Sequence, residues 1–267
     1  MTMAKSRKQI HQMTVAQWEA AFPDENACCA YLVGHRWPEG VFCPRCGAEV
    51  RHPVATMPFK WQCYACAPNS GYRFSHLTGT IFENTNKPLR DWFRVIHLML
   101  TSKKSISALQ IQRMLGFGSY ETAHYMCHRI RAGLANKNFQ KLTGVVEVDE
   151  TFVGGKARNR HWDKRGGGPR GGTGGVGLGK AIIAGAIRRK GGVVARVIEN
   201  VHARGQYVVG AVHTQTIEGF WSLVKRGIME SFHKVTQKYL PLYVAEVQFR
   251  YNNRKNADIF GEAIRGC

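Results

Sequence analysis

Acidic residues are scarce in this chain of 267 residues, which has 18 Asp and Glu against 38 Lys and Arg. The resulting formal net charge of +20 at pH 7 favours a polyanionic partner such as nucleic acid. Because the basic residues are spread over the whole chain, we expect binding along a long surface that weakens steeply as salt is added. A basic protein without such a partner is the alternative interpretation.

Long hydrophobic runs are also missing. The stretch 95–100 is interrupted by His97 and is far shorter than the roughly 20 apolar residues that span a bilayer. The first 13 residues are basic but lack the apolar centre of a secretory signal, and no basic amphipathic anchor helix is recognisable. We therefore expect an intracellular protein with no membrane association, in which the eight cysteines do not form a disulfide framework.

Four cysteines have the spacing Cys43-x2-Cys46-x16-Cys63-x2-Cys66. Each C-x-x-C pair makes a tight turn that points two thiolates at one place, and the long intervening loop can fold back as a hairpin. Four sulfurs then complete a tetrahedral structural zinc site with no open coordination position. Zinc binding would supply about 10–16 kcal/mol to a module too small to fold alone. The spacing therefore predicts a structural zinc ribbon rather than a redox pair.

Changes in composition divide the chain into four regions, and the predicted fold class is α/β multidomain. We expect N-terminal helices in residues 1–35, the zinc ribbon in 36–82, a helix-turn-helix-like region in 83–140, and an α/β domain in 141–267. A glycine-rich, basic segment at 154–179 is predicted to be a mobile loop.

Residues 105–134 read as two helices joined by the turn 116–119, with Ser119 as the cap of the second helix. A helix-turn-helix places its second helix in the major groove of DNA. A plain helical hairpin that packs under a neighbouring domain is the alternative. The predicted DNA-contacting side chains are Tyr120, His124, His128, Arg129 and Arg131, whereas Cys127 is expected to be buried.

An acidic strand is predicted at 145–153, with Asp149 at its centre and Glu147 on the same face. A carboxylate in the middle of a buried strand is costly unless it is paired or binds a metal ion. A later helix carries Glu218 and Lys225, which are two helical turns apart and share one face. Phosphodiester chemistry with Mg²⁺ needs hard carboxylate ligands, and a nearby lysine can hold a DNA phosphate. A strand acid at a solvent-facing edge is the alternative.

Several long blocks carry a resemblance to a known family. They are residues 36–40 (RWPEG), 43–47 (CPRCG), 77–83 (LTGTIFE), 146–155 (VEVDETFVGG), 213–227 (HTQTIEGFWSLVKRG) and 249–254 (FRYNNR). Over nearly its whole length the chain resembles the bacterial insertion-sequence transposases that have an N-terminal zinc ribbon and an ISXO-like DDE domain. A ribbon of a transcription or ribosomal factor would not explain Asp149, Glu218 and Lys225 together.

The resemblance implies an RNase H-like fold that cuts the ends of a mobile element and joins the 3′-hydroxyls to target DNA. On this basis Asp149 matches the first catalytic acid, Glu218 the third polar member and Lys225 the basic residue that follows, with Gln215 as a weaker candidate for the third position. Asp149 and Glu218 would hold catalytic Mg²⁺ or Mn²⁺. The implied partners are inverted-repeat ends, target DNA and further copies of the chain, in the cytoplasm and at the nucleoid of a bacterium.

The second catalytic Asp of the family is missing. Between Asp149 and Glu218 the chain has only Asp163, in the glycine-rich segment. Only 18 residues separate Glu199 from Glu218, which is too short for the expected helix, strand and connection and predicts an internal deletion near 200–202. Glu147, Glu150 or Glu199 are possible substitutes. We therefore expect a transposase-family protein that binds DNA but is defective in catalysis. The alternative is a non-catalytic remnant that represses or inhibits an intact transposase.

Overall fold

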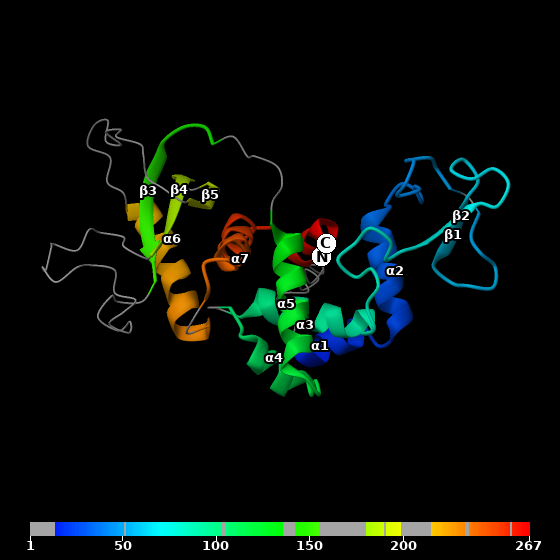
Figure 1. Ribbon diagram of the computed structural model, residues 1–267, viewed down its shortest axis with the longest axis horizontal. Coiled ribbons are helices and arrows are strands. Elements are labelled where there is room, and N and C mark those ends of the chain that lie inside the picture. The colour runs from blue at the N-terminus through cyan, green and yellow to red at the C-terminus, as the bar shows by residue number, and fades with distance from the viewer. Residues whose placement is uncertain are drawn as a thin grey trace, which may run out of the picture. The chain divides into compact units, whose positions relative to one another are not determined.

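The computed structural model describes residues 14–50, 52–102, 105–135, 142–154, 180–189, 191–198, 215–232, 235–256 and 258–267 (Figure 1). The chain forms two compact units. The first contains the chain up to Ala135 together with Lys255–Cys267, and the second is Asn136–Arg254. Within the described ranges, none of the helices combines the length and apolar character needed to cross a membrane. The glycine-rich segment, Glu199 and the proposed deletion near 200–202 lie outside the described residues.

Six helices of the described residues belong to the first unit: α1 (Val15–Ala21), α2 (Glu25–Arg36), α3 (Leu89–Thr101), α4 (Ala108–Leu115), α5 (Tyr120–Leu134) and α8 (Ile259–Gly266). Most begin at a side chain that accepts a hydrogen bond from the first turn, as Asp24 does for α2 and Ser119 for α5. The cap of α3 comes from another helix, because the carboxylate of Glu25 accepts the N–H groups of Leu89 and Arg90 at 2.6 and 3.0 Å.

Aromatic rings from α1, α2, α3 and α8 form part of the core of the first unit. Phe22 lies 5.4 Å from Phe93 and 6.1 Å from Phe260, measured between ring centroids. The buried apolar residues of α8 explain why this helix packs against α2, α3 and α5, although the sequence placed it in the last domain. Asp258 both caps α8 and pairs with His35 of α2 at 3.2 Å.

The second unit has a three-stranded antiparallel sheet in the order β3 (Val146–Val153), β4 (Ala181–Arg188), β5 (Val193–Ile198). Helix α6 (Gln215–Arg226) continues into a π-helical turn at Gly227–Phe232, and α7 (Leu240–Asn252) follows. Apolar side chains of β4, β5, α6, the π-helical turn and α7 share one core, which comprises Ala181, Ile183, Ile187, Val193, Ala195, Ile217, Phe220, Trp221, Val224, Ile228, Leu240 and Val244. Helix α6 therefore lies against the sheet that carries Asp149.

The edge of β5 is covered by side chains of α7. Asn252 accepts the N–H of Val193 at 2.7 Å and donates to its carbonyl at 3.0 Å, and Gln248 accepts the N–H of Ala195 at 2.8 Å. These bonds satisfy backbone groups that an edge strand would otherwise leave open. The mixed helix and sheet architecture agrees with the predicted α/β class.

Candidate functional site

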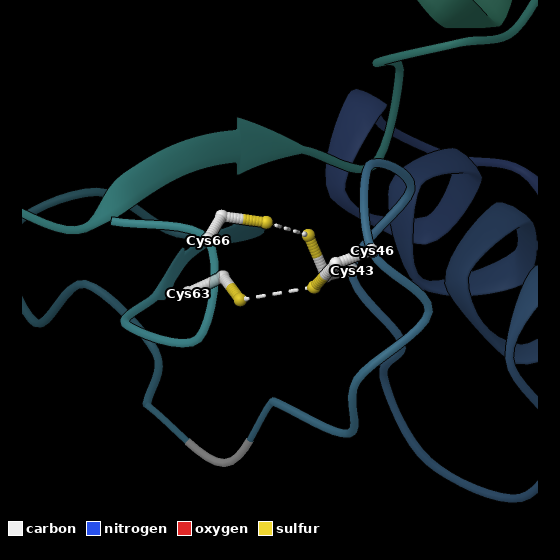
Figure 2. A group of neighbouring side chains, drawn as sticks. All are labelled: Cys43, Cys46, Cys63 and Cys66. Carbon is white, nitrogen blue, oxygen red and sulfur yellow. Dashed lines mark hydrogen bonds between the residues drawn. The ribbon is translucent and has the colours of Figure 1, made fainter. Parts of the chain in front are cut away.

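The four predicted cysteines converge in the first unit (Figure 2). Their sulfur atoms all lie within 4.8 Å of one another, with Cys43 Sγ 3.6 Å from Cys66 Sγ and Cys46 Sγ 3.7 Å from Cys63 Sγ. A tetrahedron with Zn–S bonds of about 2.3 Å has sulfur–sulfur edges of about 3.8 Å. The cluster therefore fits a structural zinc ion held by all four thiolates.

Local backbone geometry builds the two halves of this cluster. In the first pair, the N–H of Gly47 donates to the carbonyl of Cys43 at 2.9 Å, and the positive φ of +73° at Gly47 closes the turn. Cys63 ends β1 (Lys60–Cys63), which pairs with β2 (Tyr72–Ser75). A small core of Cys43, Val50, Cys63 and Phe74, flanked by Trp37 and Trp61, supports the sulfurs.

The thiols of the cluster share their protons unequally. A hydrogen bond with the Ala48 backbone lowers the pKa of Cys46 to about 7, and hydrogen bonds with the other thiols act in the same direction. The bond to Cys46 raises the pKa of Cys66 to about 12. Cys46 therefore reaches the thiolate form, which is the form that binds zinc, near neutral pH.

A second site candidate is a groove of about 350 Å³ between β3 and α6. Strand β3 contributes Asp149, Glu150 and Thr151, and α6 contributes Glu218, Trp221, Ser222, Lys225 and Arg226. The structure thus brings the three sequence-predicted residues Asp149, Glu218 and Lys225 to one groove. Asp149 is half-buried, whereas Glu218 and Lys225 are exposed. Nothing is described for the side chain of Gln215.

Asp149 is tied directly to α6. The indole Nε1 of Trp221 donates a hydrogen bond to Asp149 Oδ2 at 3.0 Å. Trp221 was not a sequence-predicted site residue, although a signal existed. It lies three residues after Glu218, and a spacing of three places two side chains on the same side of a helix.

Glu147 lies two residues before Asp149 on β3. Unlike Asp149, it binds the start of α6. Its side chain is 1% exposed, and Oε1 accepts from Arg189 Nε at 2.8 Å and from the Thr216 hydroxyl at 3.0 Å. Oε2 accepts the backbone N–H groups of Thr216 and Ile217 at 3.0 and 3.1 Å. Burial raises the pKa of Glu147, but these hydrogen bonds outweigh it and hold the pKa below the usual value. The carboxylate caps α6, so the structure does not offer it as a substitute metal ligand.

Within the described ranges, the four cysteines are the one group of three or more Cys, His, Asp or Glu side chains close enough to hold a single ion. The acidic residues of the groove, Asp149, Glu150 and Glu218, do not form such a group in this conformation. Mg²⁺ commonly keeps several waters and takes one or two carboxylates together with phosphate oxygens. Asp149 and Glu218 fit that type of site, with the remaining coordination positions left to water or phosphate oxygens.

The predicted helix pair is present as α4 and α5, joined at Gly116, which has a φ of +68°. Tyr120 is 48% exposed, and Tyr125, which was not predicted, is 56% exposed. Arg131 is only 1% exposed, which corrects its prediction as a DNA-contacting residue: it lies four residues after the buried Cys127, on the inner side of α5.

Other side chains of α5 that were predicted to contact DNA interact with groups of the protein itself. Arg129 donates to the carbonyl of Glu83 and to the Tyr125 hydroxyl. Burial, His124 and Arg131 lower the pKa of His128 to about 4, and burial and Arg131 also lower the pKa of His124. At neutral pH both imidazoles are therefore uncharged and do not add to the positive charge of this helix.

Comparisons with known proteins match the two candidate sites separately. A transposase zinc-ribbon domain matches residues 23–69, which include the four cysteines. An ISXO2-like transposase domain matches residues 199–252, which include Glu218 and Lys225 but not Asp149.

One curated protein, "Uncharacterized protein in transposable element ISH50" of Halobacterium salinarum, is 29% identical over 145 residues. The match covers 54% of this chain and 47% of that protein, so it spans about half of the relative's length. No solved structure matches the chain. The zinc-ribbon match, the transposase-domain match and the relative from a transposable element together support similarity to the insertion-sequence transposases.

Proposed function

We propose that the chain binds the ends of an insertion sequence and belongs to the reaction that cuts these ends and transfers them to target DNA. The observation that carries the proposal is the groove between β3 and α6, where Asp149, Glu218 and Lys225 meet. Asp149 lies 69 positions before Glu218 and 76 before Lys225 in the sequence, so only the fold brings the strand acid to these two helix residues.

In this proposal Asp149 and Glu218 hold Mg²⁺ or Mn²⁺, which would activate the attacking hydroxyl and stabilise the leaving oxygen. Lys225 and Arg226 line the same groove at the end of α6. Their positive charge would hold a DNA phosphate beside the two carboxylates, where the backbone would otherwise be repelled. The RNase H-like character of the unit is part of the same proposal.

DNA binding would use the first unit as well. The net charge of +20 provides a strong non-specific attraction, and α4–α5 would act as a helix-turn-helix with Tyr120 at the exposed start of its second helix. Zinc in the ribbon has a structural role only, because four thiolates leave no open position. We also propose that copies of the chain assemble on DNA, in the cytoplasm and nucleoid of a bacterium.

We further propose that the chain is defective in strand transfer. The sequence between Asp149 and Glu218 contains a single Asp, Asp163, which lies in the glycine-rich segment. We do not assign it as the second catalytic Asp, so that residue is missing. This absence favours one alternative function, in which the chain occupies element ends without cutting them and so represses or inhibits an intact transposase.

The test uses purified full-length chain with labelled duplexes of the inverted repeat that flanks its reading frame, and a scrambled duplex as control. We expect tighter binding to the repeat and no joined product with Mg²⁺ or Mn²⁺. Joined product that disappears in Asp149→Ala would refute the defect and support the enzyme. Equal binding to repeat and scrambled duplexes would refute recognition of element ends.

A further inference from the structure

The indole ring of Trp221 occupies a narrow space between the carboxylate of Asp149 and the backbone of β4. Asp149 pairs with Gly185 across the sheet, and Trp221 donates to Asp149 Oδ2 at 3.0 Å. A Cβ atom at Gly185 would lie 2.6 Å from Cη2 and 2.8 Å from Cζ2 of Trp221. These distances are far below normal carbon–carbon contacts, so a side chain at Gly185 is incompatible with the observed ring position.

The indole has little freedom to move away. Trp221 is 4% exposed and belongs to the core of the second unit, with its ring centroid 5.2 Å from that of Phe220. Because interiors are close-packed, a displaced ring would disturb several neighbours. Packing alone would be served by another aromatic ring. What only tryptophan adds at this place is an N–H donor aimed at a half-buried carboxylate.

The hydrogen bond from Trp221 distinguishes the two carboxylate oxygens of Asp149. Oδ2 of Asp149 is held by Trp221, whereas Oδ1 has no hydrogen-bond partner in the part of the chain that the structure describes. Asp149 lines the groove, so Oδ1 is the oxygen available to a cation there. A donor to one oxygen fixes the rotation of the carboxylate, and partners of this kind tune the affinity of metal-ligating groups.

We propose that Trp221 is the positioning residue for Asp149 and that Gly185 provides the clearance that lets it act. Trp221 sets which oxygen of Asp149 faces the groove and thereby raises the affinity of the groove for a divalent cation. The inference rests on the proposed function, because it takes Asp149 as a cation ligand. It assigns roles to two residues that no catalytic motif in the sequence suggested.

Two variants and one control test the proposal. Trp221→Phe keeps an aromatic ring and removes the donor. Gly185→Ala leaves both Trp221 and Asp149 unchanged but places a Cβ against the ring, and Gly185 has no positive φ that would make alanine unfavourable. The matched control is Trp92→Phe, because Trp92 is 1% exposed and its Nε1 donates to Thr85 at 2.9 Å in the other unit.

The first measurement is Mn²⁺ binding by the full-length chain, followed by the paramagnetic resonance of free Mn²⁺. The component lost in Asp149→Asn defines the groove. We expect this component to weaken by about 10- to 100-fold in Trp221→Phe, to weaken in Gly185→Ala, and to remain unchanged in Trp92→Phe. The dispersion of amide resonances in each variant verifies that the second unit is folded.

The second measurement does not need a metal ion. The indole ¹H–¹⁵N resonance that disappears in Trp221→Phe belongs to Trp221. We expect it to shift in Asp149→Asn, which replaces the charged acceptor of the indole N–H, and to stay unchanged in Glu150→Gln. A resonance that does not shift in Asp149→Asn would refute the hydrogen bond and with it the positioning role.

The two proposals fail in different ways. If Mn²⁺ binds in an Asp149-dependent manner but Trp221→Phe binds it as tightly as the unchanged chain, the positioning role is wrong and the proposed function stands. If Asp149→Asn has no effect on Mn²⁺ binding, the cation site itself is wrong and both proposals fall.

Discussion

The carboxylate of Glu147 offers the sharpest test of how the second unit holds its groove together. Glu147→Gln preserves the size of the side chain but removes its charge. In the structure the charged carboxylate accepts hydrogen bonds from two backbone N–H groups at the start of α6, from the Thr216 hydroxyl and from Arg189. A Gln side chain has one acceptor oxygen and one NH₂ group, so it cannot accept all of these bonds.

The expected loss follows from these contacts. A helix cap contributes about 1 kcal/mol, and a negative charge at a partly buried helix N-terminus contributes up to about 2 kcal/mol. The pair with Arg189 adds little, because the Arg189 side chain is 46% exposed and stays solvated. We therefore expect the variant to destabilise the start of α6 by about 2–3 kcal/mol.

Amide hydrogen exchange measures this loss locally, which avoids assuming that the two units unfold together. At about 1.4 kcal/mol per factor of ten, peptides that cover α6 should exchange roughly 30- to 150-fold faster in Glu147→Gln. Glu150→Gln, on the same strand, is the control and should leave this exchange unchanged. Unchanged exchange in Glu147→Gln would show that the cap does not hold α6.

The pH dependence has a definite sign. The folded-state pKa of Glu147 lies below the usual value of 4.5, so the stabilisation is fully present above that value. It is lost progressively as the pH falls below about 4.5 toward the lower folded-state pKa. Protection of α6 should therefore decline in that acid range in the unchanged chain, and Glu147→Gln should remove this part of the decline.

Three further predictions concern other parts of the molecule. Cys63→Ser should abolish the one expected zinc ion per chain and make residues 23–69 sensitive to protease, because three thiolates no longer complete the site; retention of zinc, measured by elemental analysis, would contradict the cluster. Lys225→Ala should weaken DNA binding and lower the slope of log affinity against log salt by about 0.9, whereas an unchanged slope in filter binding would mean that Lys225 touches no phosphate. Tyr120→Ala should weaken binding to the inverted repeat by roughly 2- to 10-fold, the worth of about one hydrogen bond, with no loss of thermal stability; equal affinity by fluorescence anisotropy would remove α5 from the DNA surface.

The zinc cluster could be predicted from the sequence because its geometry is local. Each C-x-x-C pair fixes two sulfurs within one turn, and the hairpin between Cys46 and Cys63 needs only one strand pair to close. Helix starts were predictable for a similar reason. Ser119 was expected as a cap, and it accepts a hydrogen bond from the first turn of its helix. Such bonds join residues two or three positions apart, so no distant contact decides them.

The misjudged residues depend on distant partners or on helix orientation. The burial of Arg131 follows from which side of α5 packs inward, and the row of buried residues before it at Ala123, Cys127 and Ile130 was the available signal. The role of Glu147 could not be predicted, because Arg189 and Thr216 are 42 and 69 residues away. The attachment of α8 to the first unit likewise depends on contacts with α2, more than 200 residues earlier in the chain.

The two acids Glu147 and Asp149 lie two positions apart on β3, yet they cannot exchange roles. Glu147 is buried and has both oxygens committed to α6 and Arg189, and releasing it to bind a metal ion would free the helix that carries Glu218. Glu150 lines the groove, but the described acids there do not approach one another closely enough to surround one ion. A second strand acid could therefore replace the missing Asp only after β3 or α6 moved. Because the cap that Glu147 provides opposes this movement, the carboxylate that holds α6 against β3 is consistent with the proposed defect in strand transfer.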